Sequence, residues 1–282
     1  MTEVLTVITQ VGILSFVVAG MLGMGLSLSL REITAPLSDS RLVVGALVAN
    51  FIVVPAAAIA IGRLLPMGDA TSTAVILVGC CAGAPFLPTL AKLSHGSQPL
   101  AVGTMVLLMV VTVAFAPLVV PLAVDGAQVS ARDIAQSLIL FMLVPLAVGL
   151  LVRARYPHAA DAVVAGCNQA STVGLSVGIV SALLVTWREV FASVGSWVFI
   201  GTVLIIVVGL AAGWVGGLGH ESGDRMVLGL AAAQRNISAA LVIAASLGGD
   251  VVVQTLVAAL TLPIVLILMA SEIGKRNEPA RG

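Results

Sequence analysis

One charged side chain lies in the middle of a long apolar stretch of the sequence. Arg235 belongs to GLAAAQRNISAALVIAAS, where Gln234 and Asn236 flank it. If this stretch spans a membrane, the arginine costs about 2.5–3.5 kcal/mol on insertion scales, and such a residue usually marks a binding site or a transport pathway. Its planar guanidinium can bind a carboxylate through two parallel hydrogen bonds. The alternative is that carbonyl oxygens of a neighbouring broken helix accept its hydrogen bonds.

A second unusual stretch is TSTAVILVGCCAGAPFLPTLAKL, residues 71–93. Pro85 and Pro88 each lack an amide hydrogen, and Gly83 lowers the helix propensity beside them. A continuous helix through 82–88 would leave carbonyl groups unpaired in lipid. Such a break is tolerated only where it is buried in protein or lines a wet cavity. A simple proline kink is the alternative.

The two stretches occupy corresponding positions in the two halves of the chain. Each lies between single apolar segments, 41–65 and 98–124 for the first and 190–217 and 250–272 for the second. Paired interrupted segments of this kind indicate an inverted-repeat transporter whose site lies at the midplane, where the broken helices meet. The free amides of half-helix N-termini there suit an anion. We therefore predict a substrate site from the breaks and their flanks: Gly83, Ala84, Pro85, Thr89, Gln234, Arg235 and Asn236.

Nine segments have the roughly 20 apolar residues that a membrane-spanning helix needs. They run approximately 4–30, 41–65, 71–93, 98–124, 132–153, 160–186, 190–217, 224–247 and 250–272. The sequence thus predicts an all-α membrane protein with nine transmembrane helices and one domain, 1–282. Its first repeat would be 1–124, with four helices, and its second 132–272, with five. Two crossing helices would be broken.

Composition agrees with a membrane location. Of 282 residues, 60% are hydrophobic and 9% are charged, whereas a soluble domain carries about 25% charged residues. No cluster of Lys and Arg suggests nucleic-acid binding. Cys80, Cys81 and Cys167 have no zinc or disulfide spacing, so we expect packing thiols and no metal site. No cofactor is expected.

The basic residues give an orientation for nine spans. One set of alternate connections collects nine of them, and the other set only three: Arg63, Arg132 and Arg188. The positive-inside rule then places the N-terminus outside and the C-terminus in the cytoplasm. No transit peptide is evident, which favours a bacterial inner membrane.

Segment 160–186 adds a polar stripe, because Asn168, Thr172 and Ser176 follow one another at four-residue spacing. Asn168 and Thr172 are candidates for lining the substrate cavity. Hydrogen bonding between helices is the equal alternative.

Four strings, in order, resemble motifs of the bile acid:sodium symporter family. They are MLGMGLSLS at 21–29, VANFIVVP at 48–55, VILVGCCAGAPFLPTLAKLSHG at 75–96 and QRNISAALVIAA at 234–245. The resemblance implies ten helices in two inverted five-helix repeats, arranged as a core and a panel. This chain would lack the first, peripheral helix. It also implies that Asn50 stands at the position of a panel-side glutamine in the substrate site.

The departures from the family pattern concern sodium. Where the resemblance implies a Ser-Asn pair this chain has Leu87 and Pro88, and the crossing-helix glutamate falls on Ala231 or Leu230. Sodium prefers several oxygens, one of them anionic, as hard cations generally do. We therefore expect that ordinary two-sodium coupling is lost. The guanidinium of Arg235 would take the place of a sodium ion, with Asn50 and open carbonyls accepting its hydrogen bonds.

The sequence thus predicts a secondary transporter of a small organic anion, such as a carboxylate, acting by alternating access as a monomer or weak homodimer. A sodium-coupled symporter of the same family and a non-transporting receptor or scaffold are the alternatives. An intramembrane enzyme is not expected, because no paired acids or HExxH-type ligands lie in the spans.

Overall fold

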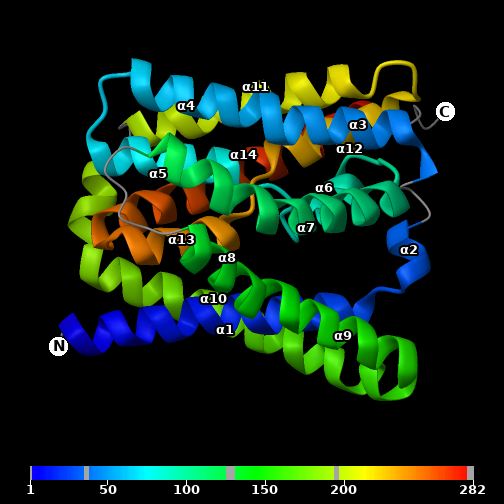
Figure 1. The fold of residues 1–282 in the computed structure, drawn as a ribbon, viewed down its shortest axis with the longest axis horizontal. Coiled ribbons are helices and arrows are strands. Elements are labelled where there is room, and N and C mark those ends of the chain that lie inside the picture. The colour runs from blue at the N-terminus through cyan, green and yellow to red at the C-terminus, as the bar shows by residue number, and fades with distance from the viewer. Residues whose placement is uncertain (1, 35–37, 125–130, 194–196, 278–282) are drawn as a thin grey trace.

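A computed structural model describes residues 2–34, 38–124, 131–193 and 197–277, and every regular element in these ranges is a helix (Figure 1). The elements of the first half are α1 (Thr2–Ser27), α2 (Leu30–Thr34), α3 (Ser40–Val48), the π-helical turn η2 (Ala49–Val53), α4 (Val54–Leu64), α5 (Asp69–Cys80), α6 (Leu87–Leu93) and α7 (Gln98–Ala123). Those of the second half are α8 (Ala131–Leu138), the π-helical turn η3 (Ile139–Leu143), α9 (Val144–Arg155), α10 (Pro157–Ser193), α11 (Trp197–Gly216), α12 (Ser222–Ala233), α13 (Ile237–Leu247) and α14 (Gly249–Asn277).

The helices form two groups that lie side by side. The first, here called the α1 group, contains α1, α8, η3, α9 and α10, and most of it forms the lower layer in Figure 1. The second, here called the crossing group, contains α3, η2, α4, α5, α6, α7, α11, α12, α13 and α14. The groups touch mainly where α8 meets α7 and α13 and where α10 meets α14.

Glycines allow the helices within each group to approach closely. In the α1 group, a Cβ atom on Gly12 would lie 2.7 Å from the backbone of Gly178, and one on Gly25 would lie 2.3 Å from the carbonyl oxygen of Leu146. In the crossing group, a Cβ atom on Gly45 would lie 2.1 Å from the carbonyl oxygen of Gly216. Backbone contact of this kind is how membrane helices pack tightly. It holds each group together as a unit.

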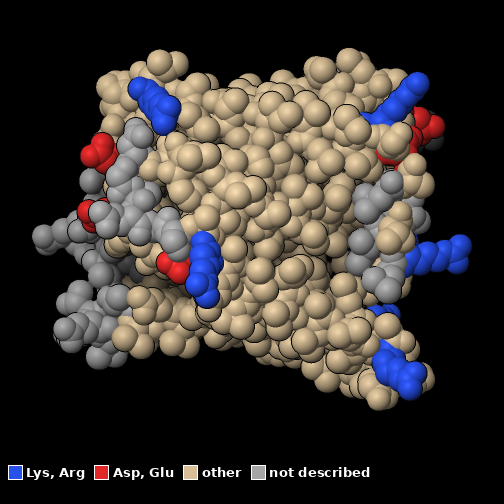
Figure 2. Space-filling model, viewed as in Figure 1, with Lys and Arg blue, Asp and Glu red and all other residues tan. Residues whose placement is uncertain are grey.

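Seven described helices are long and apolar enough to cross a membrane: Val7–Ser27, Ser40–Leu64, Gln98–Ala123, Ala131–Arg155, Trp197–Gly216, Ser222–Leu247 and Gly249–Lys275. The predicted segment 71–93 is instead the broken pair α5 and α6, and 160–186 lies within the 37-residue helix α10. The count of nine spans therefore stays a prediction. On the face shown in Figure 2, Lys, Arg, Asp and Glu gather towards the two ends of the molecule, and uncharged residues lie between them. This distribution is that of a multi-pass membrane protein.

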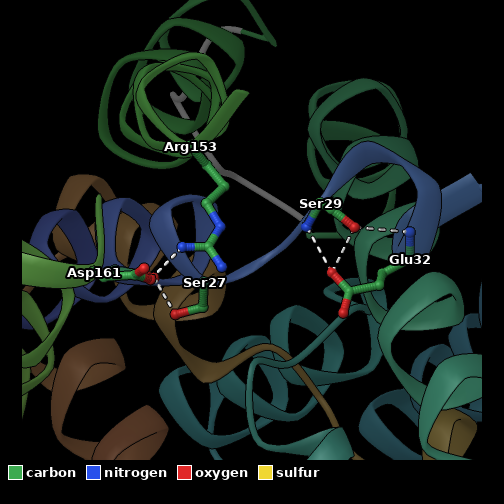
Figure 3. A network of polar contacts seen from close by, with 6 residues as sticks. Ser27, Ser29, Glu32, Arg153 and Asp161 are labelled. Carbon is green, nitrogen blue, oxygen red and sulfur yellow. Dashed lines mark hydrogen bonds and ion pairs between the residues drawn. The ribbon is translucent and has the colours of Figure 1, made fainter. Parts of the chain in front are cut away.

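A polar cluster joins the helix ends at the turn from α1 into α2 (Figure 3). Glu32 accepts hydrogen bonds from the backbone amide and the hydroxyl of Ser29, at 2.7 and 2.6 Å. These bonds lower the pKa of Glu32, and the nearby charge of Arg153 adds to the effect. Arg153 forms an ion pair with Asp161, which fixes the end of α9 against the start of α10. The cluster thus lies where the chain leaves the α1 group for the crossing group.

Candidate functional site

The first break in the crossing group runs from Cys81 to Phe86, between α5 and α6. Gly83 adopts a φ of +77°, which side chains with a Cβ atom rarely tolerate. A Cβ atom at this position would also lie 2.1 Å from the backbone nitrogen of Met109 on α7. Pro88 stands in the first turn of α6, where a missing amide hydrogen costs nothing. The predicted interruption at 82–88 is confirmed, and the alternative of a kinked continuous helix is excluded.

The second break comprises Gln234, Arg235 and Asn236, between α12 and α13. It contains no glycine or proline. Asn236 begins α13 by capping it, because its Oδ1 accepts a hydrogen bond from the amide of Ala239 at 3.1 Å. Asparagine is among the preferred residues for this role, since it satisfies an amide that has no partner in the helix. The polar residues themselves therefore end one half-helix and start the next.

The two breaks are hydrogen-bonded to each other. The backbone amide of Asn236 donates to the carbonyl oxygen of Cys81 at 2.8 Å, and its side-chain Nδ2 donates to that of Gly83 at 3.0 Å. From α7, the hydroxyl of Thr112 accepts from the amide of Ala82 at 3.0 Å and donates to the carbonyl oxygen of Ala82 at 3.1 Å. Backbone groups that no helix satisfies thus find partners inside the protein, as the absence of water requires.

Arg235 is fully buried at this junction, with 0% of its surface exposed. Its Nε donates to the carbonyl oxygen of Val78 at 3.2 Å, and its Nη2 to that of Gly79 at 2.6 Å. Its Nη1 donates to Oδ1 of Asn50 at 2.8 Å and to the carbonyl oxygen of Ala232 at 3.1 Å. All four acceptors are neutral oxygens. The guanidinium is therefore held by carbonyls of the neighbouring broken helix, as one of the two interpretations of the sequence expected. Asn50 and the carbonyl of Ala232 in α12 complete its hydrogen bonds.

Asn50 lies in the π-helical turn η2, which precedes Pro55. Turns of this type are rare and occur frequently at functional sites. Its Nδ2 donates to the carbonyl oxygen of Ala46 at 2.9 Å, so its Oδ1 is oriented towards Arg235. The turn η2 packs with α3, α4 and α11, so Asn50 lies in the crossing group, with the two broken helices.

The other predicted residues near the breaks differ in exposure. Gly83 and Ala84 are buried, whereas Pro85 and Thr89 are exposed. Gln234 has only 6% of its surface exposed, and its Oε1 has no hydrogen-bond partner among the described residues. A buried amide oxygen without a partner is costly, so Gln234 is the group at the junction most open to a ligand.

The structure does not bring Asn168 and Thr172 to the junction. Both are exposed on α10, in the α1 group, and the hydroxyl of Thr172 donates to the carbonyl oxygen of Asn168 within the same helix. The neighbouring Ser171 makes the bond between helices, since its hydroxyl donates to the carbonyl oxygen of Phe16 at 2.9 Å. Of the predicted polar stripe, Asn168 lies beside α1, since a Cβ atom on Gly23 would be 2.6 Å from its Oδ1, but the printed hydrogen bond to α1 comes from Ser171.

A shallow apolar groove lies at the boundary between the two groups. Val113 and Pro117 of α7 form one wall, Ile139 of η3 forms the other, and Arg132 of α8 also lines it. A smaller groove on the other side of α8 shares Arg132 and Ile139. These residues lie outside both breaks.

Sequence reasoning missed Thr112, and it expected carbonyl acceptors for Arg235 without identifying which residues supply them. A threonine in an apolar helix usually donates to a carbonyl group of the same helix. The sequence of 98–124 therefore did not indicate that Thr112 bonds to the first break. The carbonyl oxygens of Val78, Gly79 and Ala232 are backbone atoms and are not encoded by residue type. No cluster of three or more metal-ligating side chains occurs within the described residues.

Comparison with known families matches residues 14–213 to the sodium bile acid symporter family. A relative in Bacillus subtilis (strain 168), the uncharacterized sodium-dependent transporter YocS, is 26% identical over 200 residues, or 69% of this chain. The aligned region covers 61% of that protein's own length. The match takes in α11, the first break and Asn50, which together with the second break build the junction around Arg235. The chain therefore belongs to the sodium bile acid symporter family, a family of membrane transporters.

Proposed function

We propose that the protein is a secondary transporter of a small organic anion bearing a carboxylate, and that it works by alternating access without ordinary two-sodium coupling. The observation that carries this proposal is the guanidinium of Arg235, which is fully buried and bonded to four neutral oxygens. A buried positive charge without a counter-charge raises the local potential, and this favours an anion at the junction.

The substrate need not contact Arg235 itself, since protein oxygens already occupy its donors. At about 8 Å and an effective dielectric constant near 20, one charge attracts another by about 2 kcal/mol. We assign a direct polar contact to Gln234, whose Oε1 has no partner among the described residues and would accept a hydrogen bond from a hydroxyl group of the substrate, not from its carboxylate. Asn236, Gly83, Ala84, Pro85 and Thr89 would shape the cavity around it once the two groups move apart.

The case against ordinary sodium coupling rests on the acceptors of Arg235. A sodium ion seeks several oxygens, and the carbonyls of Val78, Gly79 and Ala232 with Oδ1 of Asn50 form such a set. The tethered guanidinium fills that set permanently, so no dissociating ion is required there. A sodium-coupled symporter is the second candidate, because the family and the name of the relative YocS both include sodium.

Alternating access would arise from movement of the crossing group against the α1 group. Each group is packed internally through glycine contacts, and the groove along α7 and α8 lies between them. Transporters of this type work by rigid-body displacement of one bundle against another around a midplane site. We further propose two inverted repeats, 1–124 and 132–272, in nine spans, in a monomer or weak homodimer of an inner membrane with the N-terminus outside.

Purified protein in detergent provides the first test. Lactate, gluconate, succinate, glucose and choline would be screened for a rise in thermal unfolding midpoint, with and without sodium. We expect carboxylates to raise the midpoint in sodium-free buffer. Uptake of the same radiolabelled compounds into proteoliposomes would follow, with N-methylglucamine replacing sodium. Failure of every carboxylate in both assays, with glucose or choline transported instead, would contradict the proposal.

Sodium coupling is tested in the same liposomes. We expect equal carboxylate uptake with sodium and with N-methylglucamine. Uptake that requires a sodium gradient, and that survives Arg235→Ala unchanged, would establish the symporter alternative. Stabilisation by a carboxylate without flux under any condition would indicate a receptor instead.

A further inference from the structure

Among the described residues, no carboxylate accepts a hydrogen bond from Arg235. Arginine stays protonated in proteins, so the guanidinium carries its charge in the buried site. Its four hydrogen-bond acceptors are three carbonyl oxygens and one amide oxygen. The ion pair of Arg153 with Asp161 and the contact of His220 with Asp39 lie at helix ends. The junction therefore has a net charge of about one unit when it is empty.

This charge belongs to one of the two groups only. Arg235 follows α12, its acceptors Val78 and Gly79 end α5, and Asn50 lies in η2. All of these elements are in the crossing group. When the crossing group moves against the α1 group, the guanidinium and its acceptors move together, and the charge is carried with the site.

We propose that this moving charge makes the protein an exchanger of monovalent organic anions, an inference that rests on the transport function proposed above. An empty crossing group carries one positive charge through the low-dielectric region of the membrane, which is costly. A bound monocarboxylate brings one negative charge and makes the loaded group neutral. The loaded form therefore crosses readily and the empty form does not, so transport in one direction requires an anion to return.

The membrane potential should act on one step only. One elementary charge that crosses the full field of 100 mV changes the energy of a step enough to alter its rate by about 50-fold, and half the field gives about 7-fold. For a monocarboxylate this applies to the return of the empty form. Exchange of one monocarboxylate for another uses only neutral forms, so it should be insensitive to voltage. A dicarboxylate gives the loaded form a net negative charge, so the loaded form should cross the membrane no more readily than the empty form.

The experiment compares two kinds of proteoliposome, one loaded with unlabelled lactate and one loaded with potassium sulfate alone. Uptake of radiolabelled lactate is measured in both, with the potential set by potassium gradients and valinomycin. Gluconate and succinate are treated in the same way. We expect exchange to exceed net uptake at least tenfold for lactate and gluconate, and less for succinate. An inside-negative potential should slow net uptake and leave exchange unchanged.

Arg235→Gln and Arg235→Lys separate charge from geometry. With glutamine the empty form is neutral, so net uptake should approach exchange, and exchange should now respond to voltage because the loaded form is charged. With lysine the charge remains, so the excess of exchange over net uptake should persist at a lower absolute rate. If glutamine prevents folding, the lysine variant and the voltage dependence of the wild type still test the inference.

The outcomes are distinguishable from failure of the proposed function. Net uptake of lactate as fast as exchange, with no response to voltage in either mode, would overturn the exchange inference alone. No flux of any carboxylate in either mode would overturn the transport proposal and the inference together. Acceleration by internal chloride would count as support, since a small anion would then neutralise the returning form.

Discussion

The two broken helices reach similar geometry by different means. The first break is caused by residues that disfavour a continuous helix. Gly83 has a φ of +77°, and the backbone nitrogens of Pro85 and Pro88 cannot donate hydrogen bonds. The second break has no such residue. Its half-helices end at Ala233 and begin at Ile237, and the side chains of Arg235 and Asn236 bond to the first break.

The difference shows which break depends on the other. The carbonyl oxygens of Gly79, Cys81 and Gly83 lie where the first helix is interrupted, and that of Val78 accepts from the amide of Cys81 as well as from Arg235. The second helix supplies the donors that satisfy them. Without these acceptors, Arg235 and the amide of Asn236 would lose their partners in the first break, and the cap of α13 by Asn236 would be left to favour a break at 234–236. We therefore regard the first break as intrinsic to the chain and the second as induced by its partner.

Replacing Arg235 by alanine should produce the largest effect, because it removes the link between the breaks. Four buried neutral acceptors would lose the guanidinium, although the oxygen of Val78 would keep the amide of Cys81 at 3.3 Å, and each buried acceptor left unsatisfied costs about 1–3 kcal/mol. The free energy of unfolding would be measured by titration with a denaturing detergent. Arg225→Ala is the matched control: Cζ of Arg225 lies 4.3 Å from the ring centroid of Trp214, an interaction worth about 0.5–1 kcal/mol. Equal losses in the two variants would contradict the dependence of the second break on the first.

Gly83→Ala tests whether the first break is intrinsic. The methyl group would meet the nitrogen of Met109 at 2.1 Å in a backbone conformation with positive φ. Strain and overpacking together should lower the free energy of unfolding by about 2–4 kcal/mol. Gly68→Ala serves as control, because nothing lies within 4 Å of that position and its φ is −68°. A Gly83→Ala protein as stable as the control would show that the glycine does not set the break.

Asn236 allows the two roles of one side chain to be separated. Asn236→Ala removes both the cap of α13 and the bond to the carbonyl oxygen of Gly83, and we expect a loss of about 1–3 kcal/mol. Asn236→Ser should retain the cap and lose only the bond to Gly83. Hydrogen exchange at the amides of 237–240 would show fraying in the alanine variant and protection in the serine variant. Fraying in both would mean that the bond to the first break, and not the cap, holds α13 in place.

The smallest effect is expected far from both breaks, at Asp39. The hydrogen bond from His220, at 2.9 Å, and the amides at the start of α3 lower the pKa of Asp39. A carboxyl with a lowered pKa in the folded state contributes stability above its unfolded pKa of about 3.9, and this is lost as pH falls through the folded value. The difference in unfolding midpoint between wild type and Asp39→Asn should therefore be constant above about pH 5 and shrink in more acidic buffer. A difference that grows on acidification would contradict this assignment.

Much of the crossing point could be predicted from residue types. Pro85, Pro88 and Gly83 revealed the first break, because each has a known backbone consequence. Arg235 revealed the second, because an arginine in an apolar stretch needs partners. Their juxtaposition followed from the symmetry of the flanking helices. The remaining partners could not be predicted in the same way, since the oxygens of Val78, Gly79 and Ala232 belong to the backbone.

Helix faces were predicted less well than helix positions. Asn168 and Thr172 share a four-residue spacing, but only Asn168 of these two lies in a printed contact between α10 and α1, together with Ser171, Gly174 and Gly178. Residue spacing fixes which side chains share a face, whereas the packing of small residues decides which face is buried. Small residues occur throughout this chain, which has 29 glycines, so their pattern did not single out one face.

The helix α11 consists almost entirely of apolar residues, yet it sets the position of the buried charge. A Cβ atom on Gly209 would lie 2.4 Å from the carbonyl oxygen of Ala232, and that same oxygen accepts a hydrogen bond from Nη1 of Arg235 at 3.1 Å. One added methyl group on α11 would press on this oxygen and shift the guanidinium relative to its other acceptors. A substitution that only adds volume to the apolar helix α11 would therefore change the position of the buried positive charge without changing the charge of the protein.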